Sequence, residues 1–290
     1  MTSNTRREPA VTTPATHREG HSWQDVSVGA ERYERGLVPA LFEPWATVLV
    51  DIAGLRPGER VLDLACGTGV MARAAARRVT PGGHVCGVDV NEDMLALARR
   101  AGPDIEWRQA EASRTSLADA SFDVAFCQQG LQFFPDRLAA LRELRRVLAP
   151  GGRAVIATWC AADAGDAGYT PITQALRRHR PHDPGPLAFI SAIFGLSDGT
   201  ELTQLVEAAG FDDVAVERRT KTVRFPSAVA WVEAFLGAAP VPAVSALEPA
   251  TSAAIVADAA TALQPYVDPT GLAFPLHTNI IRCSGQRPTS

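Results

Sequence analysis

Val61-Leu62-Asp63-Leu64-Ala65-Cys66-Gly67-Thr68-Gly69-Val70 is the stretch on which the fold prediction rests. Its apolar run is typical of a buried parallel strand, and the Gly-Thr-Gly after it predicts a tight turn into a helix that begins near Met71. Glycine lets a backbone turn sharply and approach a ligand closely, and the first N–H groups of a helix have no partner within the helix. The turn is therefore a candidate ligand-binding loop.

Strand and helix patterns alternate around this stretch, with Pro and Gly marking the joints. Strand-like runs lie at 60–65, 84–88, 105–109, 122–127, 153–159, 214–218, 222–225 and 275–283, and helical patterns at 71–78, 92–100, 137–148 and 201–209. Alternation of this kind predicts right-handed βαβ units and a sheet covered on both faces. The predicted fold class is α/β, a doubly wound, Rossmann-like, seven-stranded and mostly parallel sheet with helical lid insertions.

Composition divides the chain into a core and added segments. We expect a disordered tail at 1–22, an N-terminal helical cover at 23–55, a cofactor-binding core at 56–160, a first lid insertion at 161–199, a core helix and strand at 200–225, a second lid insertion at 226–271, and the last core strand with a C-terminal tail at 272–290. In the cover, apolar residues recur at helical spacing, interrupted or restarted around Pro39 and Pro44. The two insertions follow strands and are apolar, so we expect them to close over the site.

The overall composition is that of an ordinary soluble globular protein. Of 290 residues, 46% are hydrophobic and 21% charged, and the formal net charge is -4. A pI near 5.9 gives no support for nucleic-acid binding. The five cysteines form no C-x-x-C pair and are expected to be buried reduced thiols, and no His or Cys cluster points to a metal. No apolar stretch approaches the roughly 20 residues of a membrane span, so a cytoplasmic location is expected, while the oligomeric state stays open.

Two acids sharpen the interpretation of the glycine loop: Asp63, four residues before Gly67, and Asp89, at the end of the second strand. Gly67 to Ala72 fit the G-x-G-x-x-G/A pattern, which alone permits NAD or FAD binding. Because the carboxyl ends of adjacent parallel strands open onto one crevice, Gly67, Gly69 and Asp89 should face one ligand. A carboxylate there can accept hydrogen bonds from both hydroxyls of a ribose. NAD and S-adenosylmethionine both carry such a ribose, so an NAD(P)-dependent oxidoreductase remains an alternative.

Four motifs in order resemble those of class I S-adenosylmethionine-dependent methyltransferases, of a small-molecule branch similar to the quinone-biosynthesis methyltransferases. They lie at 61–69, 87–95, 121–126 and 148–152, and the resemblance covers about 35–160. It implies that Asp63 and the backbone of Ala65, Gly67 and Gly69 hold the methionine half of the cofactor, that Asp89 takes the ribose hydroxyls, that Val90 and Met94 flank the adenine, that Glu111 and Ala112 contact the adenine amino group, and that Gln128 lies at the methyl end. Glu111 departs from the family, which more often has Asp there.

The acceptor side is less defined by the sequence. Candidate substrate-binding residues are Tyr33, Gln129, Phe133, Trp231 and Phe235, although aromatic residues at helical spacing are also typical of a core. His277 is a candidate base, with an ordinary strand histidine as the alternative. The expected reaction is in-line methyl transfer to a small, apolar acceptor, such as a secondary metabolite, with oxygen favoured over carbon or nitrogen and proximity as the main catalytic device. The alternative within the same family is a protein that binds the cofactor without methylating, for a rearrangement or for regulation.

Overall fold

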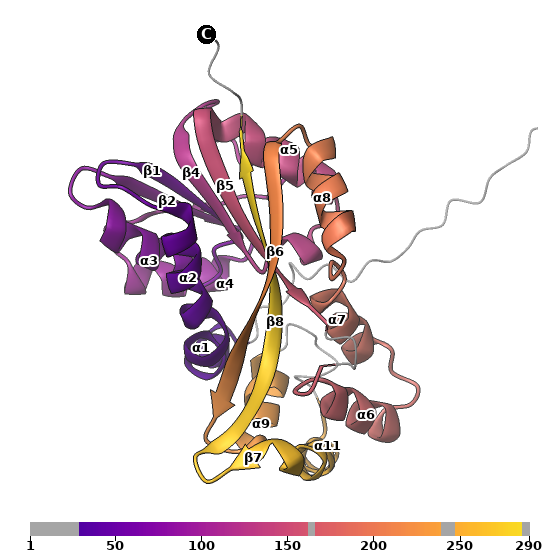
Figure 1. The fold of residues 1–290 in the computed structure, drawn as a ribbon. Coiled ribbons are helices and arrows are strands. Elements are labelled where there is room, and N and C mark those ends of the chain that lie inside the picture. The colour runs from indigo at the N-terminus through magenta and orange to yellow at the C-terminus, as the bar shows by residue number, and fades with distance from the viewer. Residues whose placement is uncertain (1–28, 162–165, 239–246, 286–290) are drawn as a thin grey trace, which may run out of the picture.

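The computed structural model describes residues 29–161, 166–238 and 247–285. Its centre is a sheet with the strand order β3-β2-β1-β4-β5-β8-β6, and the short β7 pairs with β8 (Figure 1). The strands are β1 (Arg60–Leu64), β2 (His84–Asp89), β3 (Glu106–Gln109), β4 (Phe122–Gln128), β5 (Leu148–Cys160), β6 (Asp212–Phe225), β7 (Val267–Asp268) and β8 (Gly271–Ser284). β1 to β5 pair in parallel, and β8 is antiparallel to β5 and β6. The predicted doubly wound, mostly parallel α/β sheet is thereby confirmed.

Helices cover both faces of this sheet because its strands are apolar on both sides. The helices are α1 (Ala30–Gly36), η1 (Val38–Phe42), α2 (Glu43–Ala53), α3 (Val70–Val79), α4 (Glu92–Ala101), η2 (Leu131–Phe133), α5 (Arg137–Val147), α6 (Thr170–His179), α7 (Gly185–Ile193), α8 (Gly199–Ala208), α9 (Ala228–Ala238), α11 (Pro249–Ala262) and η3 (Gln264–Tyr266). In β1, Val61 belongs to the apolar cluster that includes residues of α2 and α3, while Leu62 belongs to the cluster with α5 and α8. The alternation of side chains along a strand separates the two layers.

The N-terminal cover is two helices joined by a π-helical segment. α1 ends at Gly36, η1 follows with five residues, and α2 continues to Ala53. Pro39 lies in the first turn of η1 and Pro44 in the first turn of α2, where a missing N–H costs nothing. The sequence predicts an interruption or restart around these two prolines, and η1 and α2 do begin beside them. The 50° bend of the cover, however, lies one step earlier, between Ala30–Gly36 and Val38–Ala53.

The second half of the chain extends the sheet into a lobe beyond the core. The ends of β6 and β8 run past the other strands toward α6, α9, α11 and β7 (Figure 1). Buried side chains of these elements pack together, among them Ile172, Trp231, Ile255 and Phe274. This lobe lies next to the N-terminal cover, since α1 packs against α9.

Three details differ from the sequence interpretation. β6 is one continuous strand of 14 residues instead of two runs at 214–218 and 222–225, because Arg219 to Lys221 continue the register with β8. β5 begins at Leu148, before the Pro-Gly-Gly that the sequence predicts as a turn. The first insertion contains two regular helices, α6 and α7, where the sequence shows only weak helical patterns. The predicted tail at 1–22 lies outside the described residues.

The predicted state of the cysteines can be compared directly with the structure. All five are buried, and no disulfide joins any two of them. Within the described ranges, no group of three or more His, Cys, Asp or Glu side chains is placed to hold a metal ion. Over the same ranges no single helix is long and apolar enough to cross a membrane, and only the bent pair of α1 with Val38–Ala53 reaches that length and composition when taken together.

Candidate functional site

A cavity of about 530 Å³ opens at the carboxyl ends of β1, β2, β4 and β5. In a doubly wound sheet this is the edge at which ligands bind. One half is lined by the loops that follow β1, β2 and β3, and the other half by the N-terminal cover, the end of β5, α7 and α9. One continuous space therefore joins the glycine loop to the lid lobe.

The glycine loop is shaped by backbone conformations that favour glycine. Gly67 has φ 54° and Gly69 has φ 86°, both in the left-handed region. A Cβ on Gly67 would meet nothing within 4 Å, whereas one on Gly69 would lie 2.3 Å from the ring of Trp107. Gly67 therefore leaves the cavity wall open to a ligand, and Gly69 is required by packing against the sheet.

Asp89 holds the loop from the end of β2. Its Oδ2 accepts the N–H of Gly67 at 2.8 Å, and its Oδ1 accepts the N–H of Asn91 at 2.9 Å. Burial raises the pKa of this carboxyl, and the backbone hydrogen bonds oppose the shift. Each carboxylate oxygen keeps a second lone pair, so the group can still accept hydrogen bonds from a ligand in the cavity.

Asp63 lies beneath the loop and is fully buried. Its Oδ2 accepts the N–H of Ala72 in the first turn of α3 at 2.9 Å, while its Oδ1 has no hydrogen-bond partner. Burial is the main reason that the pKa of Asp63 is raised to about 8. A buried acceptor without a donor is costly, and a donor supplied by a ligand would reduce that cost.

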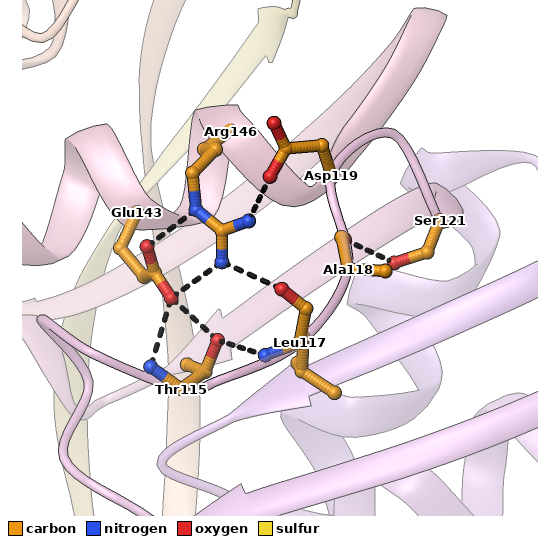
Figure 2. A network of polar contacts seen from close by, with 7 residues as sticks. All are labelled: Thr115, Leu117, Ala118, Asp119, Ser121, Glu143 and Arg146. Carbon is orange, nitrogen blue, oxygen red and sulfur yellow. Dashed lines mark hydrogen bonds and ion pairs between the residues drawn. The ribbon is translucent and has the colours of Figure 1, made fainter.

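The loop after β3 closes the far side of the cavity, with Glu111, Ala112 and Ser113 in the lining. A polar network anchors this loop to α5 (Figure 2). Glu143 accepts hydrogen bonds from the N–H of Thr115 at 2.8 Å and from its hydroxyl at 2.6 Å, and Arg146 donates to Glu143 and to the carbonyl of Leu117, each at 2.8 Å. The hydrogen bond from Arg146 is the main reason that the pKa of Glu143 is lowered to about 2.

Two glutamines at the end of β4, Gln128 and Gln129, are among the residues that line the cavity. Gln128 Nε2 donates to the carbonyl of Phe42 at 2.8 Å, which identifies the other amide atom as oxygen, and this Oε1 has no partner. Gln129 has φ 58°, and its Oε1 is also buried without a partner. A non-glycine residue at positive φ is uncommon and strained, a feature that clusters at functional sites. Ala65, at the end of β1, has φ 59° as well.

The half of the cavity beyond the glutamines is aromatic. Tyr33 and Phe42 lie 5.1 Å apart between ring centroids, and Phe42 lies 5.9 Å from Trp159. Phe189 of α7 stacks between Phe133 of η2 and Phe235 of α9, with its ring centroid 6.1 Å from each of theirs. Tyr169 meets Phe235 edge to face at 5.3 Å. All of these residues line the cavity.

The structure brings together most of the residues that the sequence singles out. Those that line the cavity are Tyr33, Ala65, Gly67, Asp89, Val90, Met94, Glu111, Ala112, Gln128, Gln129, Phe133 and Phe235. Asp63 and Gly69 lie just behind the lining, where they support the loop.

Trp231 and His277 are not in the lining. Trp231 is fully buried behind Tyr169 and Phe235, and its Nε1 donates to the carbonyl of Gly168 at 2.9 Å. It belongs to the core of the lid lobe, so the substrate role expected for it is wrong in this structure. His277 lies in the sheet, with Nδ1 2.7 Å from the hydroxyl of Thr220. It is separate from the cavity, and a role as the base has no support in this geometry.

Several lining residues are missing from the sequence interpretation. Trp159, near the end of β5, follows the same carboxyl-end rule as Asp89 and Gln128 and is predictable from it. Tyr169, Phe189 and Ile193 come from the first insertion, which carries no recognisable motif.

The charge of the lining is one-sided. Four acidic side chains line the cavity, Asp89, Asp93, Glu111 and Asp136, and no Lys, Arg or His does so among the described residues. Asp89 is the last residue of β2, and the other three belong to the segments after β2, β3 and β4, while the aromatic half contains no charged side chain. The cavity therefore favours a ligand that is cationic at one end and uncharged at the other.

Comparison with known proteins identifies the family. A family model described as a methyltransferase domain matches residues 61–152. The ubiquinone/menaquinone biosynthesis C-methyltransferase UbiE of Pseudomonas putida is 31% identical over 194 residues, which cover 62% of this chain and 75% of the relative. The chain belongs to the class I S-adenosylmethionine-dependent methyltransferases. The predicted cofactor, S-adenosylmethionine, follows from this membership.

Other matches of this methyltransferase set limits on what similarity shows. The UbiE of Hahella chejuensis is 34% identical over 152 residues, which cover 49% of this chain and only 61% of the relative. The solved structure of SpnF, titled a [4+2]-cyclase, is 21% identical with a TM-score of 0.54, and the match covers 84% of this chain and 81% of that one. The similarity to SpnF concerns the fold alone. The acceptor and the reaction therefore have to be argued from the cavity.

The residues present fit the family's cofactor. The unpartnered Oε1 of Gln128 is an acceptor suited to an ammonium group, Asp89 is suited to ribose hydroxyls, and Asp63 supports the loop from behind the lining. Gly67 leaves the backbone accessible beside them. A sulfonium is a cation, which suits a lining with acids and, over the described residues, without cations.

Proposed function

We propose that this methyltransferase transfers the methyl group of S-adenosylmethionine to a small, apolar, uncharged acceptor with a hydroxylated aromatic ring. The observation that supports this most is the single cavity that joins the acidic glycine-loop side to an aromatic half without charged side chains among the described residues. Displacement at a methyl group needs donor and nucleophile in one enclosed space. The uncharged half disfavours carboxylate or phosphate acceptors, because burying an unpaired anion is costly.

When bound, S-adenosylmethionine supplies an activated methyl group on sulfur. The part of this chain is to hold both partners and to exclude water. Gln128 and the backbone at Gly67 would bind the amino-acid end, and Asp89 the ribose. Gln129 Oε1 would accept a hydrogen bond from an acceptor hydroxyl, and the ring faces of Phe42, Trp159 and Phe189 would hold its aromatic body.

Methylation at oxygen is the first expectation, and methylation at ring carbon is the alternative that the relatives' names favour. The described lining contains no histidine, so an acceptor hydroxyl has no strong base beside it. Tyr33 and Tyr169 cannot serve as bases near neutral pH, since burial raises the pKa of both phenols and keeps them protonated. The lack of a base is the reason to keep methylation at carbon as the second candidate, with a hydroquinone-like ring as the nucleophile.

The test is an assay with S-adenosylmethionine that carries a deuterated methyl group. The acceptors are 1,4-dihydroxynaphthalene and 1,4-dihydroxy-2-naphthoic acid, which differ by a carboxylate. We expect S-adenosylhomocysteine to form in step with a product that carries a CD₃ group, and the neutral acceptor to react faster. NMR of the product then separates an O-methyl from a ring methyl.

Two outcomes would overturn the proposal. Retention of S-adenosylhomocysteine with no methylated product from a broad set of neutral hydroxyarenes would favour the non-methylating alternative. Tight retention of NADH in ultrafiltration, without retention of S-adenosylhomocysteine, would favour the oxidoreductase.

A further inference from the structure

We propose that Arg73 and Glu34 are positioning residues that fasten the N-terminal helix α1 over the cavity, and that Arg73 ties this cover to the glycine loop. The inference rests on the proposed function only for the identity of the ligand that is covered. The contact itself is a property of the chain without ligand.

Arg73 occupies a position between three parts of the site. It lies in the first turn of α3, directly after the glycine loop. Its Nη1 donates to the carbonyl of Thr68, between the two loop glycines, at 2.5 Å, and its Nη2 donates to Glu34 Oε1 at 3.0 Å. One guanidinium thereby holds the loop backbone with one nitrogen and α1 with another, a geometry that the planar fork of Arg permits and the single ammonium of Lys does not.

Helix α1 packs against α9 of the lid lobe, and two ion pairs tie it to the core. Its seven residues include none that is buried, yet it directs Tyr33 into the cavity. Its second ion pair to the core joins Glu31 to Arg100 at 3.5 Å, with side chains 61% and 68% exposed. The Glu34 and Arg73 side chains are 30% and 20% exposed. A pair that is mostly shielded from water contributes more than an exposed one, so the Arg73 pair is the stronger attachment of α1 to the core.

The segment that follows α1 is suited to act as a hinge. The chain bends by 50° at Leu37, between α1 and the helix Val38–Ala53. The first turns of that second helix are η1, a π-helix, a form that is rare and is frequent at functional sites. α2 itself is fixed to the core, because Arg153 donates to the carbonyls of Ala53 and Gly54 at its end. If the Arg73 pair is released, α1 stays packed against α9 but is no longer tied to the glycine loop, so α1 and Tyr33 can shift about the bend at Leu37 while α2 stays in place.

The pair therefore sets how fast the covered ligand leaves. The matched substitutions are Glu34→Gln, which removes the half-buried charge, and Glu31→Gln, which removes an exposed charge three residues earlier on the same short helix. We expect Glu34→Gln to raise the dissociation rate of S-adenosylhomocysteine roughly 5- to 20-fold in stopped-flow displacement, with association changed less, because the contact forms after entry. Glu31→Gln should stay within about twofold of the wild type.

Arg73→Lys tests the double contact. It keeps the positive charge beside Glu34 but cannot hold Thr68 and Glu34 together, so the dissociation rate should lie between those of the wild type and of Glu34→Gln. The double variant Arg73→Gln/Glu34→Gln should release S-adenosylhomocysteine only slightly faster than Arg73→Gln alone, since either substitution removes the same ion pair.

Hydrogen exchange of residues 30–42, measured without any ligand, separates this inference from the proposed function. We expect faster exchange there in Glu34→Gln than in Glu31→Gln, with α2 unchanged. Equal exchange and equal dissociation rates in the two variants would overturn the role of the pair. Failure of the wild type to retain S-adenosylhomocysteine, with the exchange difference present, would overturn the proposed function and leave the positioning role intact.

Discussion

Substitution of Asp89 by Asn tests the centre of the cofactor half, because it replaces one carboxylate oxygen by an NH₂ group and leaves the size of the side chain almost unchanged. In the wild type, the two carboxylate oxygens accept the N–H groups of Gly67 and Asn91 at 2.8 and 2.9 Å. Asparagine offers one oxygen and one NH₂ group, so one of these N–H groups faces a donor and loses its acceptor. The negative charge that would bind the ribose hydroxyls is lost in the same step.

The expected magnitude follows from the bonds involved. A hydrogen bond to a charged group contributes about 1.5–3 kcal/mol, and about 1.4 kcal/mol is a tenfold change in affinity. Loss of one such bond to the ligand predicts a Kd for S-adenosylhomocysteine raised about 10- to 150-fold. Isothermal titration calorimetry measures this Kd, with circular dichroism to verify the fold.

The control for Asp89→Asn is Asp123→Asn. Asp123 pairs with Arg60 at 2.7 Å at the opposite end of β1 and β4, outside the cavity lining, and the charge change is the same. Its Kd should equal that of the wild type. A folded Asp89→Asn variant that binds within twofold of the wild type would refute the assignment of the ribose to Asp89 and move the cofactor elsewhere in the cavity.

Three further predictions concern the loop, a buried acid and the network of Figure 2. Gly67→Val should abolish S-adenosylhomocysteine binding, because valine is strained at φ 54° and its side chain would project into open space at the site, and calorimetry would measure the loss. For Asp63, the folded pKa of about 8 lies above the ordinary value of 3.8, so its contribution to stability is full below about pH 4 and is lost as pH rises toward 8. Urea unfolding should therefore show that the free energy of unfolding of Asp63→Asn rises relative to that of the wild type between pH 5 and 8, by at most about 1.4 kcal/mol per pH unit. Unfolding free energies that depend on pH in the same way in both proteins would contradict this. For Glu143 the sign is opposite, since its pKa is lowered to about 2: Glu143→Gln should cost about 1–3 kcal/mol at pH 7, and the difference from the wild type should vanish as pH falls from about 4.5 to 2.

The cofactor half was predictable because its determinants are local in sequence. The turn after β1 needs residues at positive φ, and Gly67 and Gly69 indicate it. Asp89 follows at the end of the next strand, and the rule that carboxyl ends share one crevice places it beside the loop from the order of the strands alone. The same reasoning reaches Gln128, one strand further along the sheet.

The acceptor half was less predictable because its residues are assembled by packing. Trp231 and Phe235 lie four residues apart on α9, and the helical period places both on one face. In the structure Phe235 lines the cavity and Trp231 is covered by Tyr169. Only the position of α9 against the first insertion decides between pocket and core, and no pattern within α9 carries that information.

The sequence left two interpretations of His277 open, a base or an ordinary strand histidine, and the geometry agrees with the second. The residue lies in a strand that contributes to the sheet, but β8 runs antiparallel to β5, so the two strands end at opposite edges. His277 pairs with Cys160 at the end of β5, yet its Nδ1 contacts Thr220 of β6. The carboxyl-end rule that succeeds for Asp89 and Gln128 has no equivalent for an antiparallel strand.

The distribution of charge links these two halves of the cavity to the reaction. The acids follow the core strands, where they suit a cationic cofactor, and the lid segments contribute rings without charge to the lining. Transfer of a methyl group from a sulfonium to a neutral acceptor spreads positive charge from the first half toward the second. Aromatic faces stabilise a cation without themselves being charged, so they can favour that displacement while still accepting an uncharged molecule. A lid lined with Lys or Arg would oppose the same step, which gives a physical reason for the absence of basic side chains from the lining over the described residues.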